Sequence, residues 1–149
     1  MCLIVDANAA GTFLAQKSAV IDWLLGTKGS PRLCAGGKLT RELEIVGNVR
    51  VLLRQLSEAG RLRRIPDADI EAQVRQLKSK KLHRSNDAHV LALAIASGAR
   101  TLATADASLI ADFKNPRIIH DPRGRVYRDP DKHGRLLCHT PQSCRVRAF

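Results

Sequence analysis

The feature that most constrains the fold is an alternation of short apolar runs with longer segments of helical periodicity. We expect strands over the short apolar runs at 3–5, 100–104 and 118–119, a weak strand over 32–35 and a short strand of basic character over 61–65. We expect helices over the longer segments at 9–25, 39–59, 68–81, 87–97 and 107–113. Strands that are separated by helices pair in parallel through right-handed crossovers. The sequence therefore predicts an α/β fold, a three-layer α/β/α sandwich around a central, mostly parallel sheet of four or five strands.

The end of the chain departs from this alternation. Residues 125–128 and 135–139 alternate in polarity like two strands, and turn-forming residues separate them. We therefore expect a basic C-terminal β-hairpin appended to the sheet domain. This interpretation divides the chain into a sheet domain over 1–120 and a basic extension over 121–149.

The charge of the chain is strongly positive. Among its 149 residues, 25 Lys and Arg stand against 14 Asp and Glu, a formal net charge of +11. A surface this basic attracts phosphate backbones or acidic partners, although solubility alone can also explain it. Aromatic residues make up only 3% of the chain, which argues against a base-stacking platform for nucleic acid.

Two features indicate a cytoplasmic protein. The N-terminal segment has no basic region before its apolar residues, and no apolar run reaches the ~18 residues of a membrane span. We therefore expect neither a signal peptide nor a membrane partner. The four cysteines, at positions 2, 34, 138 and 144, would then face a reducing compartment, so we expect reduced thiols.

Two carboxylates follow apolar runs at positions where a strand should end. Asp6 follows the run at 3–5, and Asp106 lies just past the run at 100–104. Ligands of open α/β sheets bind at the carboxyl ends of the strands. If these two strands are neighbours in the sheet, Asp6 and Asp106 converge there.

Two further acids face the apolar sides of their helices. At about 100° per residue, Glu42 falls inside the apolar stripe of its helix, whereas Glu44 falls outside it. Asp87 shares the face of the apolar residues in the helix over 87–97, and His89 falls on the opposite side. A carboxylate that faces a core is costly unless it is paired or bound to a metal. Glu42 and Asp87 are therefore candidates for a common site.

Together, Asp6, Glu42, Asp87 and Asp106 predict a cation site. Carboxylates at close range repel one another, and a divalent cation removes that repulsion. Oxygen ligands suit Mg²⁺ or Mn²⁺ better than zinc, and such a site can activate water for hydrolysis of a phosphodiester. Each acid also has an ordinary explanation, as a cap or as a first-turn acid beside the helix dipole.

The segments that carry these acids resemble the motifs of the PIN-domain family. The motifs are residues 4–8 (IVDAN), 39–43 (LTREL), 86–94 (NDAHVLALA) and 102–106 (LATAD), which match the family in order and spacing. The resemblance covers about residues 1–120. It implies a PIN-like sandwich and a Mg²⁺- or Mn²⁺-dependent nuclease that acts on single-stranded or structured RNA, with the four acids as catalytic metal ligands. It also places Asn8 and Thr104 as supporting residues beside the site.

The same resemblance bears on partners. Many small members of the family are VapC-like toxins of toxin-antitoxin pairs, which a cognate antitoxin protein neutralises, and many form homodimers. It therefore implies an antitoxin and a second copy of this chain as partners, beside the RNA substrate. Compact members end near the fifth strand, so the basic extension sets this chain apart.

Several other residues have competing interpretations. The arginines near the expected third strand and in the extension are candidates for contacts with substrate phosphates, or they form solvated charged surfaces: Arg61, Arg63, Arg64, Arg123 and Arg125. His89 is either a surface residue or a substrate contact. Asp112 is either a solvated helical residue or a supporting or additional metal ligand.

Three functions are consistent with these observations. The first is an endoribonuclease that hydrolyses RNA through metal-activated water and leaves 5′-phosphate and 3′-hydroxyl ends. The second is a non-catalytic PIN-like module that binds RNA or protein. The third is a DNA nuclease of the flap type, which uses a similar acidic cluster.

Overall fold

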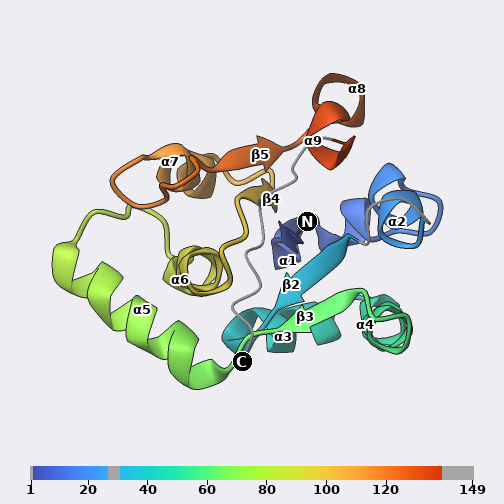
Figure 1. Cartoon of the computed structure of the whole chain (residues 1–149), viewed down its shortest axis with the longest axis horizontal. Helices are drawn as coiled ribbons and strands as arrows, with labels where there is room; N and C mark the ends of the chain where they lie inside the picture. The colour runs from blue at the N-terminus through green and yellow to red at the C-terminus, as the bar shows by residue number, and fades with distance from the viewer. Residues whose placement is uncertain (1, 27–30, 139–149) are drawn as a thin grey trace.

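The computed structural model describes residues 2–26 and 31–138. Its single sheet has five parallel strands in the order β3-β2-β1-β4-β5 (Figure 1). The strands are β1 (Cys2–Val5), β2 (Arg32–Ala35), β3 (Leu62–Arg64), β4 (Thr101–Ala103) and β5 (Arg125–Tyr127). The expectation of an α/β fold with a parallel sheet is therefore confirmed.

Helices flank both faces of this sheet. They are α1 (Ala7–Phe13), α2 (Ala19–Leu24), α3 (Gly37–Glu44), α4 (Val49–Glu58), α5 (Asp67–Lys80), α6 (Ala88–Ser97), α7 (Ala107–Lys114), α8 (Pro130–His133) and α9 (Arg135–Cys138). In Figure 1, α5 and α6 lie on one side of the strands, and α2 and α4 lie on the other. This arrangement is the three-layer sandwich that the sequence predicts. None of the helices in the described part of the chain is long and apolar enough to cross a bilayer.

The central strand is β1, which pairs with two neighbours and is buried along its whole length. Leu3 is in register with Leu33 of β2 and with Thr101 of β4. A continuous apolar strand is expected where helices cover both faces of a parallel sheet. Between β1 and β4 the order of the strands switches direction, and open α/β sheets bind ligands at such a switch point.

The two longest expected helices are each divided in two. The segment 9–25 forms α1 and α2, and the segment 39–59 forms α3 and α4. Gly47, between α3 and α4, has a φ of +40°, which residues with side chains rarely adopt. Ser18 starts α2, where its hydroxyl accepts a hydrogen bond from the N–H of Ile21 at 3.2 Å. Helical periodicity continues across both breaks, so it did not reveal them.

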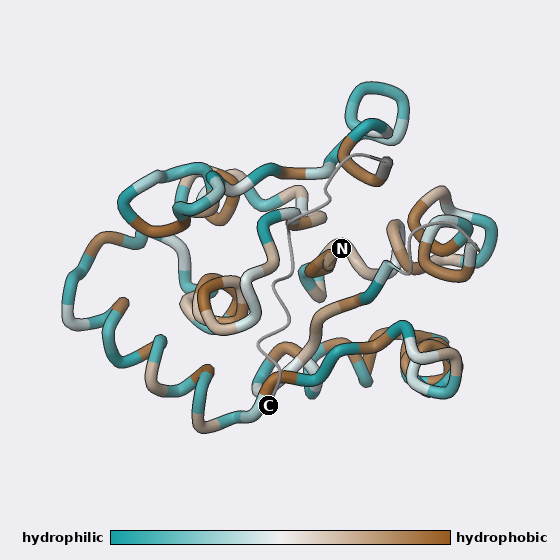
Figure 2. The backbone as a smooth tube through the Cα atoms, viewed as in Figure 1, coloured by the Kyte–Doolittle hydropathy of each residue, from teal (hydrophilic) through white to brown (hydrophobic). Residues whose placement is uncertain are grey.

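The most deeply buried helix is α6. Residues 90–94 are all fully buried, because α5 packs against this helix (Figure 1). The outer helix α5 is mainly hydrophilic, and apolar residues recur along it at intervals (Figure 2). Of these, Ile70 and Leu77 are buried. This pattern is typical of an outer helix that buries one narrow apolar stripe against its neighbour.

The expected C-terminal β-hairpin is not confirmed. Residues 125–127 form β5, which pairs in parallel with β4, and residues 135–138 form the short helix α9. Residue 139 of the expected hairpin lies outside the described residues. The sheet therefore continues past the boundary that we expected near residue 120.

The fifth strand also lies later in the chain than we expected. Ile118 and Ile119 are buried but occupy a turn, so the prediction of a strand there is wrong. Gly124 passes so close to α7 that a Cβ atom would lie 2.1 Å from the carbonyl oxygen of Phe113. This close approach leads into β5, whose Tyr127 ring packs edge-on against Phe13 with centroids 5.5 Å apart.

The cysteines differ from one another. Cys2 is disulfide-bonded, so the expectation of reduced thiols is wrong for this residue. Cys34 is a buried free thiol, and burial raises its pKa to about 11. The side chains at positions 138 and 144 lie outside the described part of the structure.

Candidate functional site

Four separate segments carry the four predicted acids to the carboxyl edge of the sheet. Asp6 follows β1 and is the N-cap residue of α1, and Asp106 follows β4 and is the N-cap residue of α7. Glu42 lies in α3, the helix after β2, and Asp87 is the N-cap residue of α6. Because β1 and β4 are neighbours, Asp6 and Asp106 leave from adjacent strand ends.

Thr104 joins two of these segments. Its hydroxyl donates a hydrogen bond to Oδ2 of Asp6 at 2.9 Å and accepts one from the backbone N–H of Asp106 at 3.1 Å. Asp6 is also anchored through its own N–H, which donates to the carbonyl of Ala103 at 3.0 Å. Thr104 is fully buried and Asp6 is 4% exposed, so these contacts are shielded from water. The side chain of Asp6 is therefore held in one orientation.

The carboxylates interact electrostatically as one group. Burial raises the pKa of Asp6, the charges of Asp87 and Asp106 raise it further, and the hydrogen bond from Thr104 opposes the rise. Burial also raises the pKa of Asp87, to which Asp106 and Glu42 add, while His89 and Lys38 lower it. All four acids therefore appear in one network of like-charge repulsion.

The fourth acid, Glu42, contacts His89, which the helical wheel places on the side of its helix away from the acids. Nε2 of His89 lies 2.5 Å from Oε1 of Glu42. Both atoms are shielded from solvent, and neither forms a hydrogen bond of good geometry. The Glu42 side chain is 35% exposed, so it lies at the edge of the core and only partly inside it. Glu44 is exposed, as its place on the helical wheel predicts.

The prediction that His89 faces away from the buried side of its helix is wrong. His89 is only 9% exposed, because α6 is enclosed on nearly all sides near its start. A helical wheel assumes one solvated face, and α6 offers none there. The signal that could have located His89 is the apolar character of almost the whole helix, which is typical of a helix buried all round.

The chemistry of this cluster fits a hard divalent cation. Its donors are carboxylate oxygens, which Mg²⁺ and Mn²⁺ prefer, and Oε1 of Glu42 is buried without a good hydrogen bond. Within residues 2–26 and 31–138, however, no three His, Cys, Asp or Glu side chains lie close enough to ligate one ion directly. Mg²⁺ commonly keeps several waters and binds few protein ligands, so its binding does not require three protein side chains around one ion.

The predicted substrate arginines do not form one track. Arg61 donates to the carbonyl of Gly26 at 2.9 Å, and Arg63 donates to the carbonyl of Ser97 at 3.0 Å. Arg125 begins β5 at the amino edge of the sheet, the edge opposite the acids. The structure therefore does not gather these three side chains beside the carboxylates.

Three other predicted residues are exposed. Arg123 precedes β5 and makes a long contact of 3.5 Å with the carbonyl of Lys114. Arg64 ends β3 at the same edge of the sheet as the acids. Asn8 is exposed within the first turn of α1, where Asp6 is the cap residue instead. Of the predicted arginines, Arg64 is thus the one at the carboxyl edge.

Asp112 is neither solvated nor turned toward the acid cluster. It is 2% exposed, and its carboxylate accepts hydrogen bonds from the N–H groups of Arg84 and Ser85 at 2.8 to 3.0 Å. The expectation of a solvated helical residue is therefore wrong. Asp112 fixes the loop that leads to Asp87, and this role could not be read from its helical position.

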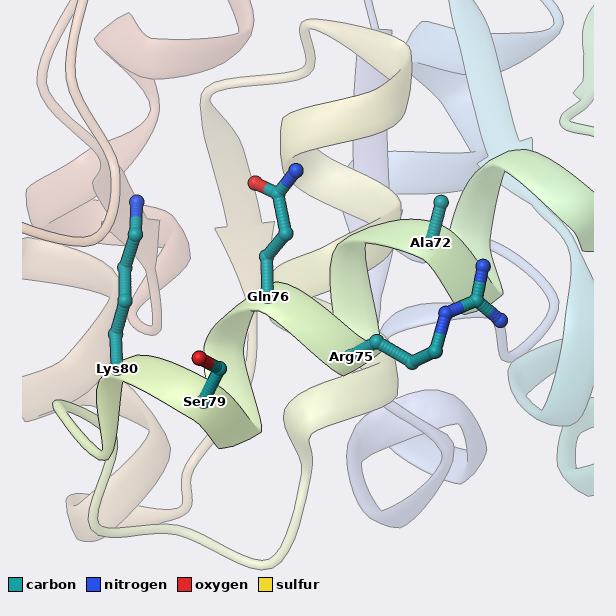
Figure 3. Close-up of a pocket in the computed structure, with 5 residues that line it drawn as sticks. All are labelled: Ala72, Arg75, Gln76, Ser79 and Lys80. Atoms are coloured by element: carbon teal, nitrogen blue, oxygen red, sulfur yellow. The ribbon is translucent and has the colours of Figure 1, made fainter.

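Two surface hollows lie away from the acids. One is formed by a single helix, α5, and its lining side chains are labelled in Figure 3: Ala72, Arg75, Gln76, Ser79 and Lys80. The other is a larger groove of about 930 Å³ between α1, α2 and α4. Neither is lined by any of the four carboxylates, so neither belongs to the candidate site.

Comparison with known proteins adds no assignment. No family model matches this chain, and no curated protein and no solved structure matches it either. Function is therefore inferred from the residues and their geometry.

Proposed function

We propose that this protein is a Mg²⁺- or Mn²⁺-dependent endoribonuclease whose site is formed by Asp6, Glu42, Asp87 and Asp106. The observation that carries the proposal is the convergence of four carboxylates from four segments, where burial and then their like charges raise the pKa values of Asp6 and Asp87. Uncompensated acids at this density are unfavourable in a folded chain, and functional sites are where such arrangements are found. The resemblance of the four segments to PIN-domain motifs supports the same conclusion.

The four acids of the site approach it from two kinds of element. Asp6, oriented by Thr104, and Asp106 approach from adjacent strand ends, while Glu42 and Asp87 approach from helices. These four acids would hold the cation. When bound, the cation would activate water and stabilise the negative charge that develops on the phosphate.

Basic residues near the acids offset their charge toward an anionic substrate. Lys38 of α3 is close enough to lower the pKa of Asp87. Its ammonium group is therefore available to attract a phosphate toward the acids. The overall charge of +11 favours the approach of nucleic acid in general.

The toxin assignment and its partners form a further part of this proposal. The groove between α1, α2 and α4 is lined largely by apolar residues, and Leu25 and Val51 on it are 48% and 58% exposed. A cognate antitoxin or a second copy of the chain would cover such a surface. A cytoplasmic location belongs to the same proposal, since the RNA targets of such toxins are there.

One observation favours the non-catalytic alternative. No three candidate ligands among the described residues are close enough to hold an ion directly. A module that only binds RNA would need no such closeness. Calorimetric titration of the chain with Mn²⁺ separates the two, because a nuclease of this kind binds the ion and a pure binding module does not.

The experiment that tests the proposed chemistry is an analysis of the product ends. RNA cut by the wild-type chain in Mn²⁺ should carry 5′-phosphate and 3′-hydroxyl ends. Ends bearing a 2′,3′-cyclic phosphate would contradict the proposal, since they arise by attack of the ribose hydroxyl. Competition between single-stranded RNA and flap-structured DNA distinguishes this activity from that of a flap-type DNA nuclease.

A further inference from the structure

A small basic pocket lies at the carboxyl edge of the sheet, the same edge as the acid cluster, and none of the four carboxylates lines it. Its volume is about 210 Å³, and the residues that matter among its lining are Gly36, Gly37, Thr40, Arg41, Arg64 and Asp67. They come from the end of β3, from α3 and from the start of α5. Two of them are cationic at neutral pH, and one is anionic.

The position of the pocket ties it to the candidate site. Helix α3 carries Thr40 and Arg41 on the pocket and Glu42 in the acid cluster. Gly36 follows β2 as Asp6 follows β1, and these two strands are neighbours. The pocket and the acid cluster therefore share helix α3 and lie at the same carboxyl edge of the sheet.

The charges of the pocket favour an anion. Arg41 and Arg64 are exposed, and neither side chain has a hydrogen bond or an ion pair with any described residue. Asp67 already accepts a hydrogen bond from the N–H of Gly37 at 3.1 Å. Two arginines against one engaged carboxylate leave the pocket with a net positive charge.

The wall of the pocket is shaped by glycine. A Cβ atom at Gly36 would lie 2.6 Å from Cδ1 of Ile70 and 2.7 Å from the carbonyl oxygen of Ile65. Gly37 has a φ of +54°, a conformation that disfavours any side chain. On the same pocket, Oγ1 of Thr40 is buried without a hydrogen-bond partner. A hydroxyl in this state can donate to a ligand oxygen.

We propose that this pocket binds a backbone phosphodiester of an RNA strand that extends along this edge of the sheet to the acid cluster. The proposal rests on the proposed function and names the part of the site that holds the substrate. Arg41 and Arg64 contact the phosphate oxygens, since guanidinium groups match phosphate geometry. The contact carries no base specificity, so it positions the strand without selecting its sequence.

The test measures binding without cleavage. The chain carrying Asp6→Asn is titrated, in EDTA, with a fluorescein-labelled single-stranded RNA of mixed sequence, and anisotropy is recorded across a salt series. Adding Arg41→Ala and Arg64→Ala together should weaken binding about tenfold at low salt. It should also lower the salt slope by about 0.7, the value for one phosphate contact on a single strand.

A matched pair controls for loss of charge. Arg50→Ala with Arg75→Ala also removes two exposed arginines, from α4 and α5, and should change the affinity by less than about threefold. Equal effects of the two pairs would overturn the proposal.

A second measurement uses NMR of the wild-type chain in EDTA, where the RNA should shift the amide resonances of Gly36, Gly37 and Thr40. Shifts with inorganic phosphate but not with RNA would make the pocket a site for free phosphate and would also overturn the proposal.

The result of this binding test can be distinguished from the result of the cleavage test of the proposed function. If the chain cleaves RNA but the two pairs of variants bind alike, the pocket proposal fails alone. If the chain does not cleave RNA but the Arg41 and Arg64 pair weakens binding selectively, the nuclease proposal fails alone.

Discussion

The hydroxyl of Thr104 donates a hydrogen bond to Oδ2 of Asp6 at 2.9 Å, and these residues are 98 positions apart in the chain. The same hydroxyl oxygen accepts from the N–H of Asp106, so one buried group connects the ends of β1 and β4. Because β1 and β4 are neighbouring strands, the order of the strands determines how Asp6 and Asp106 lie relative to each other.

Thr104→Val should impair the site more than the fold. Valine keeps the shape of threonine but cannot orient Asp6, so we expect affinity for Mn²⁺ and cleavage to fall about tenfold. Thr104→Ser retains the hydroxyl and should stay within about threefold of wild type. Calorimetry with Mn²⁺ measures the first effect. Equal losses in the two variants would show that the hydroxyl is not the cause.

Stability should depend on pH through Asp6 and Asp87. Their pKa values are raised in the folded chain, so folding favours their protonated forms. Their stabilising effect is complete below the usual pKa of 3.8 and is lost as the pH rises through the raised values. The metal-free chain should therefore lose stability as the pH increases above about 4, and Mg²⁺ should restore it.

Asp6→Asn isolates this effect. In EDTA at neutral pH the variant should unfold at a higher urea concentration than wild type, and the difference should shrink toward pH 4. Asp22→Asn, on the exposed face of α2, serves as the control and should show no such trend. If Asp6→Asn increased the stability toward urea by the same amount at every pH, the electrostatic explanation would be contradicted.

His89 should act by positioning Glu42, with which it is in direct contact. We expect His89→Leu to weaken Mn²⁺ binding about tenfold, and we expect His89→Gln to recover part of the loss because its amide can donate to the carboxylate. In a Glu42→Gln background, His89→Leu should have little further effect on Mn²⁺ affinity. Additive losses in that double variant would indicate that His89 acts independently of Glu42.

Asp112 should be important for stability. Asp112→Ala leaves the part-buried N–H of Arg84 and the buried N–H of Ser85 without an acceptor, which should lower the free energy of unfolding by about 2–4 kcal/mol. Urea denaturation measures the loss. Asp69→Ala, at an exposed position in the first turn of α5, should cost less than about 1 kcal/mol. Comparable losses in the two variants would contradict the role given to Asp112.

The first four strands could be predicted because each is a short segment between two helical segments, although only β1 and β4 are strongly apolar and β3 (Leu62–Arg64) is basic. The fifth could not, since the apolar pair Ile118 and Ile119 reports burial and carries no information about backbone conformation. The true strand, Arg125–Tyr127, depends on the close passage of Gly124 past Phe113, which is a tertiary contact. The breaks at Ser18 and Gly47 were missed because the hydrophobic period does not change there.

The candidate site was predictable where periodicity and strand ends determine position. Asp6 and Asp106 followed from strand ends, and Glu42 and Asp87 from helical faces. The contact of His89 with Glu42 was not predictable, because it depends on how α3 packs against α6. The prediction that the arginines lie together near the substrate was not confirmed, because the sequence does not show which edge of the sheet each arginine reaches.

The most direct test of the central claim is cleavage of a mixed pool of structured and single-stranded RNA. The wild-type chain is assayed with Mn²⁺ and with EDTA, and Asp6→Asn is assayed with Mn²⁺. We predict cleavage by the wild type that requires the metal and is lost in Asp6→Asn. Cleavage that persists in EDTA or in Asp6→Asn, or RNA binding without any cleavage, would contradict the account.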